Sequence, residues 1–131
     1  AMAPAAADTI LQHFKDTKTG PDEYNFILTG DLGQTGKEIL RSLLEEKKIK
    51  IKNKLRDCGD EIFAKKKKYG AGGSGAAALA VTMGSVIIPE MINKKNRKGL
   101  IVGTGALLSP LTVKQKESIP AIAHAIVIES I

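Results

Sequence analysis

Short apolar runs alternate along this chain with amphipathic stretches, and this alternation limits the available folds more than any other feature. Residues 24–29 and 100–103 are apolar runs that end at or just before a glycine, a pattern typical of buried strands. Residues 3–16 and 36–48 repeat apolar residues at helical spacing instead. Strands that alternate with helices of this length are typical of a layered α/β fold. The 131-residue sequence therefore predicts one domain, residues 1–131, with an α/β layered fold in which helices pack on a sheet.

Weaker patterns complete the expected order of elements. Isoleucine and lysine alternate at the start of residues 49–57, which predicts an edge strand, and residues 59–64 suggest another short strand. Residues 109–120 are polar and contain two prolines, so they predict a loop, and residues 121–128 predict a final strand. Because two strands then follow the last expected helix, the sheet is expected to be mixed, with an antiparallel part.

Residues 75–93 predict a third helix, which follows the glycine-rich segment 71–75 and which we expect Pro89 to kink. Its apolar stretch, residues 75–88, is 14 residues long and is shorter than a membrane-spanning helix requires. Backbone N–H groups of a glycine-rich loop at a helix start are able to hold an anion. Close packing of the helix start explains the same glycines equally well.

The net charge of +6 is concentrated between residues 47 and 68, where ten basic residues accompany three acidic ones. The ten basic residues are Lys47, Lys48, Lys50, Lys52, Lys54, Arg56, Lys65, Lys66, Lys67 and Lys68. Such a stretch attracts phosphates, anionic lipid or acidic ligands, or it is simply a solvated surface. Aromatic residues make up only 4% of the chain, so stacking on nucleic-acid bases is not expected.

The cysteine and histidine content argues against several kinds of site. One cysteine, Cys58, forms no internal disulfide, and one cysteine with two histidines does not supply a structural zinc site. Arg56 would lower the pKa of the Cys58 thiol, whereas Asp57 and Asp60 would raise it, and no histidine lies near it in the sequence. We therefore expect neither a covalent enzyme nor a cofactor or metal site.

Residues 30–38, GDLGQTGKE, follow an apolar run and precede a helix, which is where a phosphate-binding loop would lie. The phosphate-loop pattern requires glycine at position 31 and serine or threonine at position 38, but these positions hold Asp31 and Glu38. Both substitutions place negative charge where a phosphate would bind. A tight turn between a strand and a helix is the better interpretation.

The segment 109–125 is the densest group of polar residues between apolar runs, and it predicts a ligand pocket. His124 lies in an apolar strand, where a histidine is more often a hydrogen-bonded core residue than a catalyst. Including the glycine-rich loop, the residues expected to contact a ligand are Gly72, Gly73, Ser74, Ser109, Glu117, Ser118 and His124.

Several segments, in their order along nearly the whole chain, resemble the stage V sporulation protein AD family. They are residues 1–10 (AMAPAAADTI), 28–33 (LTGDLG), 57–59 (DCG), 71–75 (AGGSG), 103–110 (GTGALLSP), 117–120 (ESIP) and 122–125 (IAHA). The resemblance implies a thiolase-like fold of two similar halves, of which this chain is the C-terminal half without its first strand. In the wider thiolase fold the nucleophilic cysteine belongs to the other half, so the resemblance implies no catalysis.

The same resemblance implies a function in spore formation. The family is linked to the uptake of dipicolinic acid, carried with Ca²⁺, into the developing spore, and it works with other stage V sporulation membrane proteins. We therefore expect a protein of the forespore or spore, either soluble or peripheral on the inner spore membrane. A separate N-terminal half or a second copy of the chain are further expected partners. The alternatives are a residual thiolase-like or acyltransferase-like enzyme fragment, and a basic module that binds anionic membrane or nucleic acid.

Overall fold

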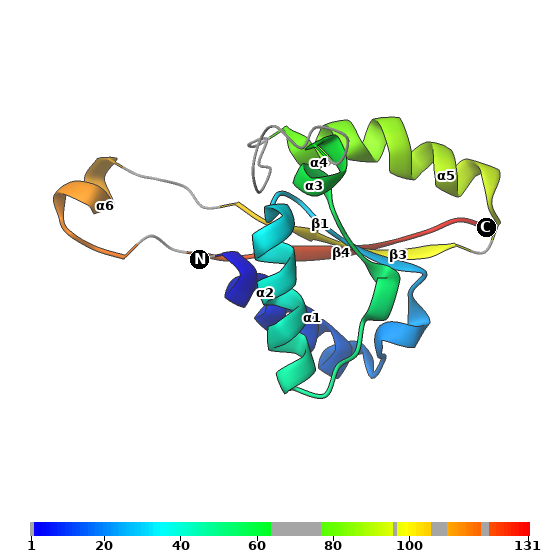
Figure 1. The fold of residues 1–131 in the computed structure, drawn as a ribbon, viewed down its shortest axis with the longest axis horizontal. Coiled ribbons are helices and arrows are strands. Elements are labelled where there is room, and N and C mark those ends of the chain that lie inside the picture. The colour runs from blue at the N-terminus through cyan, green and yellow to red at the C-terminus, as the bar shows by residue number, and fades with distance from the viewer. Residues whose placement is uncertain (1, 64–76, 96, 106–109, 119–120) are drawn as a thin grey trace.

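The protein forms an α/β structure around one four-stranded mixed sheet (Figure 1). The computed structural model describes residues 2–63, 77–95, 97–105, 110–118 and 121–131. The strands are β1 (Phe26–Thr29), β2 (Leu55–Asp57), β3 (Lys98–Gly103) and β4 (His124–Glu129), in the spatial order β2-β1-β3-β4. Strand β1 is parallel to β2 and β3, and β4 is antiparallel to β3. The expected mixed α/β sheet is thus confirmed.

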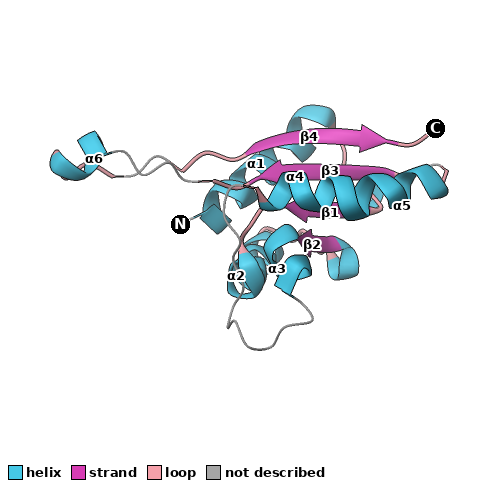
Figure 2. Cartoon of the chain, turned by 90° about the horizontal axis from the view of Figure 1, so that it is seen from above, coloured by secondary structure: helices cyan, strands magenta, loops and turns pink. Residues whose placement is uncertain are grey.

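Helices lie on both faces of the sheet (Figures 1 and 2). Helices α1 (Met2–Thr17) and α2 (Gly33–Glu46) pack on one face. The other face carries α3 (Cys58–Phe63), α4 (Ala78–Thr82), a π-helical turn (Met83–Ile87, η4) and α5 (Ile88–Asn93). Two short 3₁₀ turns, η1 (Pro21–Glu23) and η2 (Lys52–Lys54), precede β1 and β2.

Alternate residues of the central strands divide the core into two layers. Ile27, Leu100 and Val102 point to the α1 and α2 side, whereas Leu28 and Ile101 point to the α4 and α5 side. All five are buried, which explains why these strands read as continuous apolar runs and not as alternating ones. Each fully buried aliphatic side chain contributes about 1.5–3 kcal/mol to folding.

The prediction of a strand over residues 59–64 is wrong, because the helix α3 begins at Cys58, directly after β2. The predicted edge strand over residues 49–57 is reduced to the three residues of β2. Ile51 turns into the core and is fully buried, and the 3₁₀ turn η2 follows it. The alternation of isoleucine and lysine therefore does not produce an extended strand here, because the chain turns at Ile51 to bury this side chain in the core.

The third predicted helix is irregular one turn before Pro89. Ile88 donates its backbone N–H to the carbonyl of Met83, five residues earlier, as in a π-helix. Pro89 has no N–H to donate, and it occupies the first turn of α5, where this loss is tolerated. Within the described ranges, no helix combines the length and the apolarity needed to cross a bilayer.

The prediction of a loop over residues 109–120 is wrong in part, because it contains the short helix α6 (Pro110–Lys114). Pro110 occupies the first helical position, for which its fixed backbone angle is suited. Figure 1 places α6 beyond the end of the sheet, away from the two helical layers. The final strand begins at His124 and not at residue 121.

Candidate functional site

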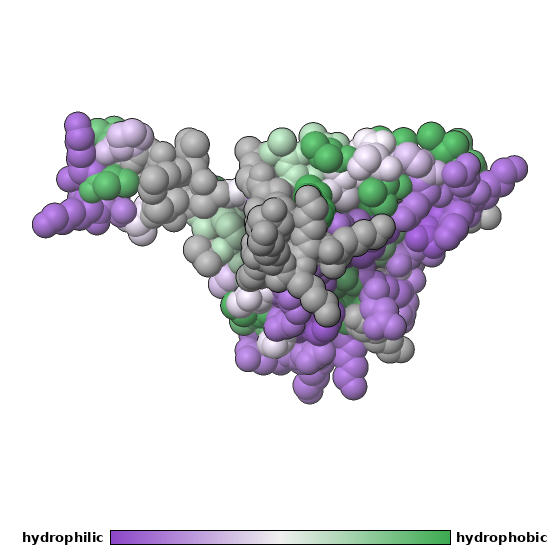
Figure 3. Space-filling view, turned by 45° about the horizontal axis from the view of Figure 1, so that its top comes forward, coloured by the Kyte–Doolittle hydropathy of each residue, from purple (hydrophilic) through white to green (hydrophobic). Residues whose placement is uncertain are grey.

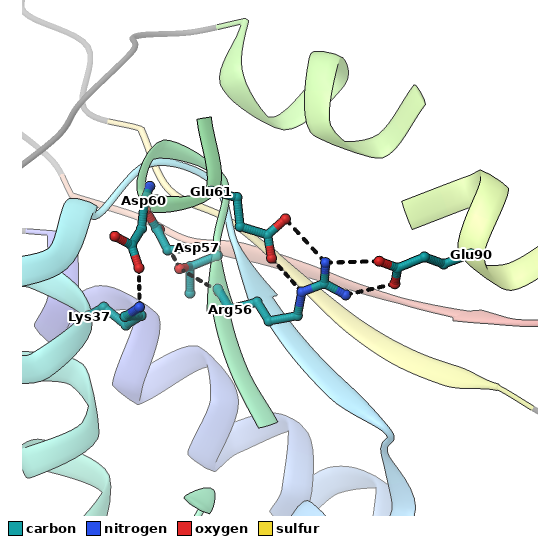
Figure 4. Close-up of polar contacts among 7 residues, drawn as sticks. Lys37, Arg56, Asp57, Asp60, Glu61 and Glu90 are labelled. Carbon is teal, nitrogen blue, oxygen red and sulfur yellow. Dashed lines mark hydrogen bonds and ion pairs between the residues drawn. The ribbon is translucent and has the colours of Figure 1, made fainter. Parts of the chain in front are cut away.

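A buried carboxylate, Asp57, organises the end of the sheet where β1 and β2 terminate (Figure 4). It accepts a hydrogen bond from the hydroxyl of Thr29 on the neighbouring strand, at 2.5 Å. It also accepts the backbone N–H groups of Leu32 at 2.7 Å, Gly33 at 2.9 Å and Asp60 at 3.1 Å. Four donors from three segments of the chain therefore converge on one side chain.

Asp57 caps two helices at once. The N–H groups of Leu32 and Gly33 belong to the start of α2, and the N–H of Asp60 lies in the first turn of α3. These groups have no partner inside their helices, and a negative charge at a helix N-terminus is favourable. The carboxylate of Asp57 thus occupies the place at the start of α2 where a phosphate loop would hold its phosphate. The structure places a tight turn at residues 30–32, between β1 and α2, and residues 33–38 form the start of α2.

The turn is packed too closely for larger residues. Gly33 has a φ of 70°, in the left-handed region that glycine adopts most readily. A β-carbon added at Gly59 would collide with the carboxylate of Asp31. The backbone N–H of Asp31 in turn donates to the Thr104 hydroxyl, at 2.8 Å, just after β3 ends. The ends of β1, β2 and β3 are therefore joined by hydrogen bonds and contacts.

Ion pairs surround this buried centre (Figure 4). Lys37 of α2 pairs with Asp60 of α3. Arg56 of β2 pairs with Glu61 of α3 and reaches Glu90 of α5, at 2.9 Å between Nη1 and Oε2. Burial alone would lower the pKa of Arg56, but hydrogen bonds with the two glutamates raise it above its usual range. The hydrogen bond with Arg56 lowers the pKa of Glu90. Arg56 is thus held charged between two helices.

Cys58 is a poor candidate nucleophile. Its side chain is fully buried and contributes to the core between the sheet and α4. Burial raises the pKa of the Cys58 thiol to about 11, and the negative charges of Asp57 and Glu61 act in the same direction. The thiolate is the reactive form of cysteine, so this thiol is unreactive near neutral pH.

The structure separates the predicted ligand residues that it describes. Glu117 and Ser118 follow α6 and are exposed. His124 is the first residue of β4 and is also exposed, so its interpretation as a core residue is wrong. Gly72, Gly73, Ser74 and Ser109 lie outside the described residues. Glu117 and Ser118 do not line the groove that contains His124.

This groove lies between α1 and the start of β4 and has a volume of about 560 Å³. It is lined by Asp8, Thr9, Gln12, His13, Asp16, Ala123, His124 and Ala125. Thr9 holds the two walls together by donating to the carbonyl of Ala123 at 2.9 Å. His13 contacts the Tyr24 hydroxyl at 2.5 Å, and burial lowers the pKa of His13. Among the described residues, no three His, Cys, Asp or Glu side chains are placed to hold a metal ion.

Sequence reasoning missed both the role of Asp57 and the second histidine of the groove. A sequence signal for Asp57 exists, since an aspartate that follows a strand and precedes a helix is a common N-cap. His13 and His124 are 111 positions apart in the sequence, and no local pattern links them. The packing of α1 against the start of β4 places both histidines in one groove.

Two comparisons place the chain among known proteins. Residues 1–129 match the family model described as stage V sporulation protein AD (SpoVAD). The chain is also 47% identical, over 129 residues, to a protein of Bacillus subtilis (strain 168) named stage V sporulation protein AD. This match covers 98% of the chain and 38% of the relative, so the chain spans well under half of the relative's length.

Proposed function

The chain belongs to the stage V sporulation protein AD family, and we propose that it acts in spore formation by binding dipicolinic acid, with or without Ca²⁺, for uptake into the developing spore. The observation that carries the sporulation role is the match to this family over residues 1–129. Dipicolinic acid is the ligand implied by the resemblance of the sequence to the family. A spore location follows from the same proposal.

The position of His124 supports a ligand site at the end of the sheet where β1, β2 and β3 terminate. His124 pairs with Gly103, the last residue of β3, so it lies beside the carboxyl ends of the parallel strands. Open α/β sheets bind ligands at this end. Asp8 and Asp16 line the same groove and would repel a free dianion, whereas they are compatible with a calcium complex. The proposed ligand therefore fits this groove better with its cation.

Binding without catalysis is the mode of action we propose. The one cysteine of the chain is buried, and its raised thiol pKa disfavours the thiolate. A residual acyltransferase in which Cys58 is the nucleophile would need its thiolate form. Turnover of an acyl-coenzyme A substrate that is lost in Cys58→Ala would support that alternative over ours.

The alternative of a basic binding module is weakened by pairing within the chain. Lys54 lies 3.7 Å from Asp22, and Arg56 is engaged by two glutamates. Lys47, Lys48 and Lys50 remain exposed. Binding to anionic vesicles that falls steeply with salt would favour this alternative.

The apolar surface of α4 and α5 supports a larger partner. Figure 3 shows hydrophobic residues gathered over these helices, and Val81, Ile88 and Ile92 are all exposed. A groove of about 400 Å³ lies between α5 and the C-terminal end of β4, lined mainly by methionine and isoleucine. Exposed apolar patches of this kind mark interaction surfaces. We propose that the part of the family protein outside this chain covers them.

Calorimetric titration with dipicolinate tests the ligand proposal, with and without Ca²⁺. Isophthalate is the matched control, because it has the same two carboxylates but no ring nitrogen to complete a metal chelate. We expect heat of binding for calcium dipicolinate and not for isophthalate, and weaker binding by His124→Ala. Absence of binding to both this chain and the longer Bacillus subtilis relative would overturn the proposal. Binding to the relative alone would show that the site needs the remaining sequence.

A further inference from the structure

Strand β4 forms an open edge of the sheet. In the described part of the chain it pairs with β3 alone, through all six of its residues. The opposite edge, β2, has only three residues, and its central Arg56 is engaged by Glu61 and Glu90. An edge strand exposes a row of unpaired backbone N–H and C=O groups that another strand is able to bind. The longer, unprotected edge is therefore β4.

Natural edges are usually protected by lysine, proline or a bulge, and β4 has none of these. Its one acidic residue, Glu129, lies at the end of the strand, opposite Lys98 of β3, whose ammonium group pairs with Glu23. His124, at the other end, lies opposite Gly103. A second strand with the same sequence thus meets no uncompensated like charge along the centre of this edge.

Both faces of β4 expose apolar side chains. Ile126 is 60% exposed and shares its face with Ile128, which packs toward α5. Val127 is 39% exposed and shares its face with Ala125, which packs toward α1. Among the described residues, the helices on both faces therefore leave part of this strand uncovered. An added strand would cover apolar surface on both faces as well as satisfy the open backbone groups.

We propose that β4 is a self-association surface, which pairs antiparallel with β4 of a second copy about a two-fold axis at Val127. A two-fold axis perpendicular to the sheet keeps the same face of both copies on the same side. Because alternate residues of a strand point to the same face, residues that lie opposite each other then have numbers that differ by an even amount. Centred on Val127, the pairing sets Ile126 opposite Ile128 of the second copy. The two sheets become one continuous eight-stranded sheet.

Other registers are less favourable. A pairing centred on Glu129 would place two carboxylates directly opposite each other, which is destabilising. A pairing centred on Ile126 would place the polar His124 against Ile128. Centred on Val127, His124 instead lies opposite Ser130 of the second copy. The strand sequence therefore favours one register.

This inference does not depend on ligand binding. The competing occupant of the edge is the part of the family protein outside this chain. That part is able to cover β4 only in a longer protein. A second copy is able to pair with β4 when this chain is studied alone. Sedimentation of this chain over a range of concentrations therefore distinguishes the two occupants.

The test compares two lysine substitutions at exposed apolar positions. Val127→Lys places two like charges directly opposite each other at the proposed axis, so it should weaken the dimer at least about tenfold. Ile39→Lys makes the same change on α2, where Ile39 is 48% exposed, and should leave the dimer unchanged. A monomeric wild-type chain, or a dimer that is equally sensitive to both changes, would refute the proposal.

A disulfide test checks the register and needs no loss of folding. Opposite residues in an antiparallel pair lie about 4.5–5.5 Å apart between Cα atoms, within the range of a disulfide. Val127→Cys should therefore form a covalent dimer under mild oxidation. Ser42→Cys, on the exposed surface of α2, should not. Equal cross-linking at both positions, or none at Val127, would count against β4 pairing.

Discussion

Replacing Asp57 by alanine should destabilise the protein more than any other single change at the end of the sheet. The substitution leaves three backbone N–H groups, from Leu32, Gly33 and Asp60, without their acceptor. Each buried donor that loses its partner costs about 1–3 kcal/mol, and the Thr29 hydroxyl loses its contact as well. Water and small backbone shifts will satisfy part of these donors, so we expect the free energy of unfolding to fall by about 3–5 kcal/mol.

Urea denaturation followed by far-ultraviolet circular dichroism measures this loss. Asp57→Asn keeps the shape and one acceptor oxygen but removes the charge at the two helix starts, so it should fall between wild type and Asp57→Ala. Thr29→Val removes one donor and should cost about 1 kcal/mol. Asp22→Ala, which removes an exposed carboxylate, is the matched control and should not change the midpoint. A loss below about 1 kcal/mol for Asp57→Ala would refute the capping argument.

Three further predictions concern neighbouring residues. Burial raises the pKa of the Cys58 thiol to about 11, so stability that is complete below pH 9 should fall as pH rises through 11, and iodoacetamide should label Cys58 only after unfolding. The pKa of Glu90 is lowered by its hydrogen bond with Arg56, so stability should fall as pH falls through that lowered pKa. Glu90→Gln should remove this part of the acid sensitivity, as monitored by circular dichroism between pH 2 and 5. Gly59→Ala should destabilise the protein by about 1–3 kcal/mol in urea, since the new methyl group meets the carboxylate of Asp31.

The elements with a strong periodic pattern were predictable from sequence. Helix α1 differs from its predicted bounds by one residue at each end, and β1 and β3 lie where apolar runs meet glycine. The failures concern residues 49–64, where β2 and α3 meet. Asp57 supplies an N-cap signal for the helix start at Cys58, but a short apolar segment such as residues 59–64 does not by itself distinguish a strand from a helix. The thiolase-like arrangement stays a prediction.

The candidate site was less predictable than the fold. The sequence predicts His124 as a ligand residue on the final strand, but its polar neighbours in the groove come from α1, at the other end of the chain. Glu117 and Ser118 were grouped with it by proximity in the sequence, and the structure does not place them in its groove. A pocket depends on which elements pack together, and local composition does not contain that information.

The sequence by itself determined the family, the layered α/β class and the absence of a phosphate loop at residues 30–38. The family follows from the similarity of motifs along the chain. The α/β class and the missing phosphate-loop residues follow from apolar periodicity and residue types, which are local properties that survive any packing. Only the tertiary structure decided that Asp57 takes the place of an anion at two helix starts, that Cys58 is buried, and that β4 leaves an edge open. Those outcomes depend on contacts between segments distant in sequence, where burial and hydrogen-bond geometry set the charge and accessibility of each group.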